Sequence, residues 1–211
     1  MKTVQRLLPF ITLIILVVAL SIATPHFLTA TNLSSVVRQT AVFNIMALGM
    51  TLIIISSGVD LSVGSILAMG GLMGTMAMSK GQPILVGVLV GILTGGLFGL
   101  LNGLAITRLN ISPFIVTLGT MGIVRGLALV VSNGLPVHEI PKAFSYLGEG
   151  TVLGVPFVLL LLVVCAFLVH FLLDHTRLGR YTFAIGSNQD AAIYAGIPVK
   201  SAAVVRINLC A

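Results

Sequence analysis

The residues from Ser56 to Ser65 combine groups that could do chemistry inside an otherwise apolar part of the chain. The segment reads Ser-Ser-Gly-Val-Asp-Leu-Ser-Val-Gly-Ser, so it places the Asp60 carboxylate, serine hydroxyls and two glycines between two apolar runs. The whole chain has only five acidic residues, and Asp60 lies deepest among apolar neighbours. An ionisable group in such surroundings is costly unless it is paired, capped or facing water. Asp60 is therefore a candidate functional residue.

Two roles of this segment agree with its residue types. As structure, Asp60 or Ser62 could cap the helix that follows, because a carboxylate or hydroxyl accepts hydrogen bonds from free backbone N–H groups and complements the helix dipole. As function, Gly58 and Gly64 would permit a broken or re-entrant segment of the kind that transporters place beside a pathway. We favour the cap over a direct substrate contact, and we include Ser65 in the candidate site.

Two further polar residues lie within apolar runs. Asn102 is typical of residues that form hydrogen bonds between membrane helices. Arg125 follows Pro113 by twelve residues, which places it near the middle of the bilayer if the helix is regular. It should therefore face the helix bundle or a wet cavity. Asp60 is its only acidic candidate partner near the membrane interior, so a pairing of the two is a hypothesis.

The composition is that of an integral membrane protein. Hydrophobic residues make up 57% of the chain and charged residues only 8%, whereas an ordinary soluble domain is about one quarter charged. The net charge of +6 comes from scattered basic residues. Such residues collect in cytoplasmic loops of membrane proteins, so no nucleic-acid partner is expected.

The hydropathy pattern predicts an all-α fold, a polytopic transmembrane helix bundle in the lipid bilayer with six full spans and the start of a seventh. A spanning helix needs about 20 mostly apolar residues. The stretches that qualify are 7–24, 35–56, 61–79, 83–107, 113–133 and 155–173, and another apolar stretch opens near residue 198. The chain shows no linker, so residues 1–211 are predicted to form a single transmembrane domain.

Glycines recur every four residues in the fourth predicted span, at positions 87, 91, 95, 99 and 103. Small residues at this spacing let a second helix backbone approach closely. Shorter versions occur at Gly70 and Gly74 and at Gly122 and Gly126. We interpret these glycines as packing seams, which indicate a tight bundle but no particular chemistry.

The distribution of basic residues favours a cytoplasmic N-terminus and a multi-pass topology. With this orientation six basic residues fall inside, namely Lys2, Arg6, Arg108, Arg177, Arg180 and Lys200. Lys80, Lys142 and Arg38 fall outside. Residues 174–197 then form the longest internal connection, with a short predicted helix near Gln189–Tyr194. A small surface helix in such a segment is a candidate docking element for another protein.

Four segments carry a resemblance to a known family. They are Gly58–Ser65, Gly99–Gly103 with its Asn-Gly pair, Ser112–Thr120 continued to Arg125-Gly126, and Gly179-Arg180 through Gly196-Ile197. In order and spacing the chain resembles the permease subunits of bacterial ABC importers for ribose and other monosaccharides, which are related to branched-chain amino-acid permeases. Members of that family are about half as long again, so the chain is expected to be the N-terminal part of a longer permease.

The resemblance implies a bacterial inner-membrane transporter subunit, not an enzyme, without a cofactor or metal of its own. It implies three partners: a cytoplasmic ABC ATPase, a periplasmic or lipid-anchored sugar-binding protein, and a second permease subunit in a homodimer or heterodimer. The chain has no GxxxxGK[ST] phosphate loop, which agrees with ATP being bound elsewhere. Residues 174–197 resemble the coupling segment that contacts the ATPase, with candidate residues Gly179, Arg180, Gly186, Asn188, Ala191, Ala192 and Gly196. The translocation or structural motif comprises Gly58, Asp60, Ser62, Gly64, Ser65, Asn102 and Arg125.

Two other function classes are weighed against this interpretation. An ion-coupled secondary transporter would use Asp60 as a proton or cation site and would need no ATPase. An intramembrane enzyme ranks last, because the spans contain no convincing nucleophile–base pair and no HExxH motif.

Overall fold

Glycine, proline and asparagine residues set the ends of the helices along the chain. The structure, a computed structural model, describes residues 2–210. The third and fourth predicted spans are separated by a turn with Gly81 at φ +83°, and the fifth helix has Pro113 in its first turn and ends before Asn133 at φ +52°. These are the positions at which a left-handed residue or a missing N–H group ends or starts a helix.

The described residues form ten helices and one two-stranded antiparallel sheet. The helices are α1 Lys2–Ala23, α2 Ala30–Ile55, α3 Val63–Ser79, α4 Ile84–Arg108, α5 Pro113–Ser132, α6 Lys142–Glu149, α7 Phe157–His175, α8 Arg177–Ser187, α9 Gln189–Tyr194 and α10 Val199–Cys210. The strands are β1 Thr151–Val152 and β2 Val155–Pro156, with Val152 opposite Val155.

Four helices are long and apolar enough to cross a membrane, namely α2, α4, α5 and α7. The prediction of six full spans is confirmed for these four. The first and third predicted spans contain shorter apolar helices, Leu7–Ala23 and Val63–Ser79. The third span is short because residues 56–62 are not helical, so α3 begins at Val63 and not near residue 61. We call residues 56–62 the linking segment.

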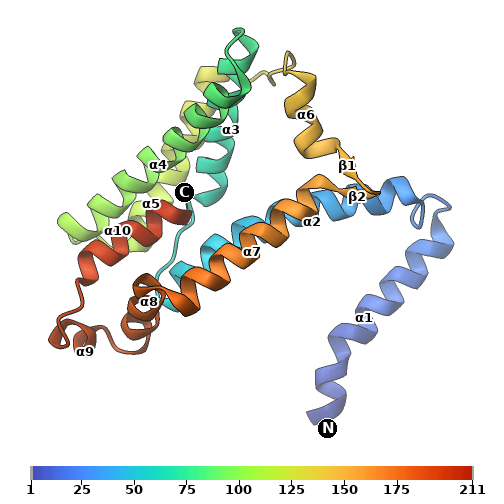
Figure 1. Cartoon of the computed structure of the whole chain (residues 1–211). Helices are drawn as coiled ribbons and strands as arrows, with labels where there is room; N and C mark the ends of the chain where they lie inside the picture. The colour runs from blue at the N-terminus through green and yellow to red at the C-terminus, as the bar shows by residue number, and fades with distance from the viewer. Residues whose placement is uncertain (1, 211) are drawn as a thin grey trace.

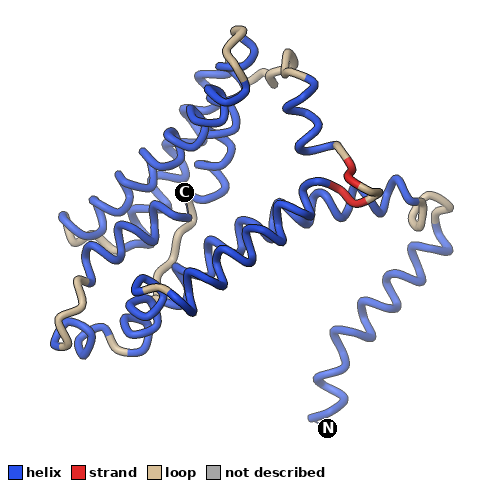
Figure 2. The backbone as a smooth tube through the Cα atoms, in the orientation of Figure 1, coloured by secondary structure: helices blue, strands red, loops and turns tan. Residues whose placement is uncertain are grey.

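The helices pack in two groups (Figure 1). Helix α4 lies between α3 and α10, with α5 packed on α3 and α4, while α2 pairs with α7. Helix α10 contacts both α2 and α4, so it joins the two groups, and α8 contacts α2, α7 and α10. Helix α1 extends away from the others in Figure 1. Figure 2 shows the linking segment as a long tan stretch between α2 and α3.

The glycines of α4 form the predicted packing seam, and they serve two partner helices. A Cβ added at Gly70 would lie 3.0 Å from the Gly91 carbonyl oxygen, and one added at Gly74 would lie 2.7 Å from the Gly87 carbonyl oxygen. The backbones of α3 and α4 therefore touch where these glycines meet. At the other end of α4 a Cβ at Gly103 would lie 3.0 Å from the Cα of Val204 in α10.

The two glycines expected to form a packing seam on α5 have no helix packed against them in the described part of the chain. A Cβ added at Gly122 or Gly126 would meet no described atom within 4 Å. These two glycines lie in open space, so within the described chain they do not bring two helices together. The segment between α5 and α7 contains α6 and the short strands β1 and β2.

Candidate functional site

The linking segment begins with a hydrogen-bonded stop to α2. Ser57 adopts φ +58°, its N–H donates to the Ile54 carbonyl (2.9 Å), and the Gly58 N–H donates to the Ile53 carbonyl (2.9 Å). This pattern is a Schellman motif, with a serine in the left-handed position that glycine usually takes. A Cβ added at Gly58 would lie 2.9 Å from Ile53 Cγ2. The predicted break in the helix is therefore present, and Gly58 permits the close return of the chain.

Asp60 organises the end of the linking segment, and its role differs from the predicted helix cap. Its side chain is only 3% exposed. Asp60 Oδ1 accepts hydrogen bonds from the Ser62 N–H (2.8 Å) and the Ser62 hydroxyl (2.6 Å). Ser62 precedes α3 at the N-cap position but has helical backbone angles, and its side chain caps no N–H group. Asp60 thus fixes the residue that starts α3 instead of capping the N–H groups within the helix.

The polar contacts continue from Ser62 into two other helices. Asn102 Nδ2 in α4 donates to Ser62 Oγ (2.9 Å), and the Thr120 hydroxyl in α5 donates to Asn102 Oδ1 (2.6 Å). Ser62 and Asn102 are 0% and 1% exposed. The predicted interhelical hydrogen bonds of Asn102 are therefore present. Thr120 ends the Ser112–Thr120 segment of the family resemblance, but it was not predicted as a site residue because threonines in apolar helices commonly bond to their own helix.

We call Asp60, Ser62, Asn102 and Thr120 the polar chain. Asn102 lies six residues before the end of α4, which corresponds to about 9 Å along a helix at 1.5 Å per residue. The linking segment therefore enters the region that the helices span instead of staying at its edge. Non-helical backbone at such depth is tolerated only where protein or a water-filled cavity surrounds it, and the polar chain supplies these surroundings.

One oxygen of Asp60 has no partner. Among the side chains that the structure describes, the buried polar atoms without a hydrogen bond are Asp60 Oδ2 and Arg38 Nε. Arg125 does not fill this role: its side chain is exposed on α5, and the one ion pair among the described side chains joins His170 and Asp174. The hypothesised pairing of Arg125 with Asp60 is thus absent from the described residues.

The other residues of the predicted motif are placed on the first turn of α3. Ser65 is buried, and Gly64 is exposed with no described atom within 4 Å of an added Cβ. Gly64 therefore makes no close approach of the kind seen at Gly58. The structure brings together Asp60, Ser62 and Asn102, but it leaves Gly64 and Arg125 outside this cluster.

The predicted coupling segment forms two consecutive helices. The Thr176 side chain accepts from the Gly179 N–H (3.3 Å) at the start of α8, and Asn188 Oδ1 accepts from the Ala191 N–H (2.9 Å) at the start of α9. These are ordinary N-caps. Gly196, at φ +77°, follows the end of α9. The predicted helix near 189–194 is present, whereas α8 was not predicted.

Two glycines of α8 let this helix pack closely against α2 and α7. An added Cβ at Gly186 would overlap the Ile55 carbonyl at the end of α2, and one at Gly179 would overlap the Leu173 carbonyl in α7. Ser57 Oγ also donates to the Gly186 carbonyl (3.4 Å). Helix α8 is therefore pressed directly against the start of the linking segment.

The opposite face of this segment is open. Ala192 is buried in a small core with Ile185 and Ala202. Arg180 and Ala191 are exposed, and so are three large side chains: Phe183, Ile193 and Tyr194, the last of which is 91% exposed. One face of α8 and α9 thus packs inward, while the other presents a cation and apolar groups.

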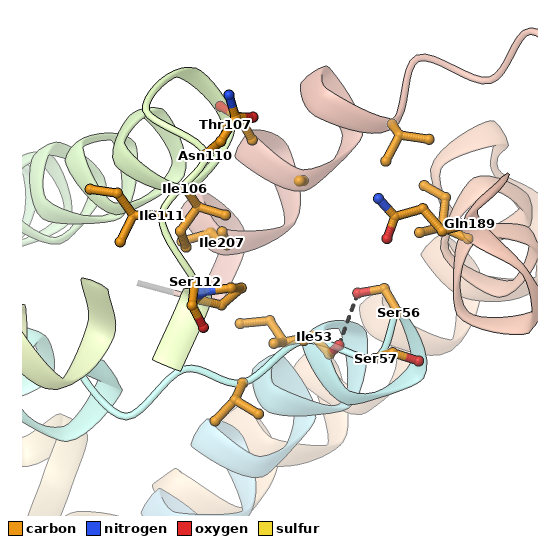
Figure 3. Close-up of a pocket in the computed structure, with 16 residues that line it drawn as sticks. Ile53, Ser56, Ser57, Ile106, Thr107, Asn110, Ile111, Ser112, Gln189 and Ile207 are labelled. Atoms are coloured by element: carbon orange, nitrogen blue, oxygen red, sulfur yellow. Dashed lines mark hydrogen bonds between the residues drawn. The ribbon is translucent and has the colours of Figure 1, made fainter. Parts of the chain in front are cut away.

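A cavity of about 390 Å³ lies between three connections of the chain. Its walls come from the end of α2 and the linking segment, from residues 106–113 between α4 and α5, and from α8 to α10. In Figure 3 the side chains of Ser56 and Gln189 lie on one side of this cavity and those of Ile106, Ile111 and Ile207 on the other. The linking segment and the coupling segment therefore share a space that is not fully packed.

Comparison with known proteins assigns this architecture to a family. Residues 32–207 match the family described as branched-chain amino acid transport system / permease component. The chain belongs to this permease family. The match includes the linking segment, the polar chain and the coupling segment, so the permease fold accounts for the polytopic helical architecture.

Curated relatives of the permease are sugar-import proteins of bacteria. The chain is 43% identical over 208 residues to Ribose import permease protein RbsC of Bacillus subtilis, and this match covers 97% of the chain and 64% of the relative. It is 36% identical to the protein of the same name in Escherichia coli K12, covering 95% and 64%. For the L-arabinose transport system permease protein AraH of Escherichia coli K12 the identity is 38%, covering 88% and 56%.

The permease thus spans slightly less than two thirds of the length of these relatives. No solved structure matches it.

Proposed function

We propose that the chain is the membrane permease subunit of an ABC importer for a monosaccharide such as ribose. The names of the relatives, which include ribose, D-allose and L-arabinose permeases, support a sugar as substrate. Within the structure, one observation carries the proposal: α8 packs directly against the end of α2. An ATPase that binds α8 would therefore be in mechanical contact with the helices of the pathway.

The coupling segment is the proposed ATPase-binding surface. Its exposed Arg180, Phe183 and Tyr194 offer a charge and aromatic groups of the kind that protein interfaces use at their centre. The buried Gly179 and Ala192 and the partly buried Gly186 hold the segment on the membrane helices, with Asn188 capping α9 and Gly196 ending it. Movement of the ATPase would therefore reach α2 and α7 directly, and the cavity beside the linking segment leaves room for displacement.

We further propose an inner-membrane, multi-pass topology with a cytoplasmic N-terminus. The linking segment, the α4–α5 connection and the coupling segment meet around one cavity. Three basic residues lie in these connections or at the helix ends beside them, namely Arg108, Arg177 and Arg180, as expected for a cytoplasmic side. The spans are then α1 to α5 and α7, with the linking segment completing the crossing of α3, while α10 begins a seventh.

The exposed Arg125 supports a wet or protein-covered surface along α5. A cation on a lipid-facing mid-helix position is costly, so this face is proposed to line the sugar pathway or meet the second permease subunit. An external sugar-binding protein would deliver the substrate. The proposed translocation motif comprises Asp60, Ser62 and Asn102 with Gly58, Gly64, Ser65 and Arg125.

The proposal is tested by uptake into proteoliposomes that contain the full permease protein, its ATPase and its binding protein. We expect uptake of radiolabelled ribose, or of another pentose or hexose, that requires internal ATP and the binding protein.

Asp60 Oδ2, buried without a partner, is the observation that favours the alternative of an ion-coupled transporter. That alternative predicts uptake driven by a proton or sodium gradient with no ATPase present, a result that would overturn the importer assignment.

A further inference from the structure

The hydrogen bonds of the polar chain all run in one direction. The Thr120 hydroxyl donates to Asn102, the Asn102 amide donates to Ser62, and Ser62 donates through its hydroxyl and its N–H to Asp60 Oδ1. Each hydroxyl has a single hydrogen to give, so the order of donors is fixed from α5 through α4 to the linking segment. The Asp60 carboxylate is the final acceptor.

The other end of the linking segment is tied to the coupling segment. The Schellman hydrogen bonds hold Ser57 and Gly58 on the end of α2, and Gly186 in α8 lies against the Ile55 carbonyl. Only Val59 separates Gly58 from Asp60. One short non-helical stretch thus joins the surface on which α8 rests to α3, α4 and α5.

Resting on the proposed function, we propose that the linking segment transmits the motion of the coupling segment to α4 and α5, and that Asn102 and Thr120 are positioning residues for coupled transport. The hydrogen bonds of the polar chain connect the linking segment to these two helices. Without them, no hydrogen bond of the described residues would join the linking segment to α4, and a displacement of α8 would reach α4 and α5 only through the packing of α3.

Two details of the site agree with this role. Thr120 bonds to another helix, whereas Thr117, one turn earlier and fully buried, bonds to the Pro113 carbonyl of its own helix (2.8 Å). Asp60 Oδ2 is a buried acceptor left free in this arrangement. A buried acceptor is stabilised when it accepts a hydrogen bond. A second arrangement of the linking segment that brings a donor to Asp60 Oδ2 would therefore be stabilised by that bond.

The test compares Thr120→Val with Thr117→Val in the full permease assembled with its ATPase and binding protein. Both substitutions replace a hydroxyl by a methyl group of similar size, but only the first breaks the polar chain. The measured quantity is the number of sugar molecules taken up per ATP hydrolysed. We expect Thr120→Val to lower this ratio by about threefold or more, since an interhelical hydrogen bond in a membrane is worth about that factor. Thr117→Val should leave the ratio near the wild-type value, and Thr120→Ser should restore it.

A purely structural role of Thr120 makes a different prediction. Uptake and ATP hydrolysis would then fall in parallel with the amount of folded protein, and the ratio would stay constant. Such a result, or an equal drop of the ratio in Thr117→Val, would overturn the proposal. Thr120→Ala, which removes the hydroxyl without adding a new methyl group, provides the measurement if Thr120→Val does not accumulate. Failure of the wild-type complex to couple uptake to ATP would instead count against the proposed function.

Discussion

Asp60 is a buried carboxylate whose two oxygens have different surroundings. Oδ1 accepts two hydrogen bonds from Ser62, and Oδ2 accepts none. The contribution of this residue to folding therefore depends mainly on one acceptor atom, which an amide oxygen can replace. The negative charge itself has no partner among the described side chains.

This difference leads to a prediction for two substitutions of Asp60. Asp60→Asn keeps an acceptor for the Ser62 N–H and hydroxyl, whereas Asp60→Leu leaves both donors buried without a partner. Each unsatisfied donor costs about 1–3 kcal/mol, so Asp60→Leu should be less stable than Asp60→Asn by about 2 kcal/mol or more. Thermal stability of the detergent-purified proteins measures this difference. Equal losses in both variants would show that the charge, and not the acceptor, is what the site requires.

At the scale of the helices, the α3–α4 contact depends on glycine backbones that touch. Gly74 faces the Gly87 carbonyl, and Gly70 faces that of Gly91. Close approach gives dispersion contacts that association in lipid relies on, because burial from water contributes little there. The same contact sets the register of α3 against α4 and so places Ser62 beside Asn102.

Gly74→Ala should separate these two helices. The added Cβ would lie 2.7 Å from a backbone oxygen that has no flexible end to move aside, and overpacking of this kind costs about 1–3 kcal/mol. Gly71→Ala is the matched control in the same helix, because its Cβ would meet nothing within 4 Å. A lower melting temperature for Gly74→Ala only is expected. If the two alanine variants melt together, the seam does not determine the stability of the pair.

For the whole molecule, the arrangement of the connections predicts which side of the membrane each one occupies. Cysteine in place of Arg180 should react with a membrane-impermeant maleimide only after the cells are opened, whereas cysteine in place of Lys142 should react in intact cells. Cys165 and Cys210 are both free thiols, so they are first replaced by serine to remove the background. Labelling of position 180 from outside would reverse the proposed topology.

The sequence by itself determined the membrane class, the helical pattern and the family resemblance. Apolar runs of about 20 residues, broken by glycine and proline, can satisfy their backbone in lipid only as helices. It also identified Asp60 and Asn102 as candidates, because polar groups are rare in such runs. The glycine spacing of α4 predicted a seam, since small residues every four positions lie on one helix face.

Only the tertiary structure decided which of these groups meet. Residues 60, 102 and 120 lie on separate elements, so their hydrogen bonds depend on the register of α3, α4 and α5, which local sequence does not encode. The same applies to the helix cap: Asp60 or Ser62 was expected to cap α3, but Asp60 Oδ1 accepts hydrogen bonds from Ser62, and the Ser62 side chain caps no N–H group of the helix. Gly186 was predicted to couple to a partner, and only the packing of α8 revealed that it rests on the end of α2. Gly122 and Gly126 have the same four-residue spacing, yet an added Cβ at either position meets no described atom within 4 Å, because a spacing defines a face of a helix but not the neighbour that covers it.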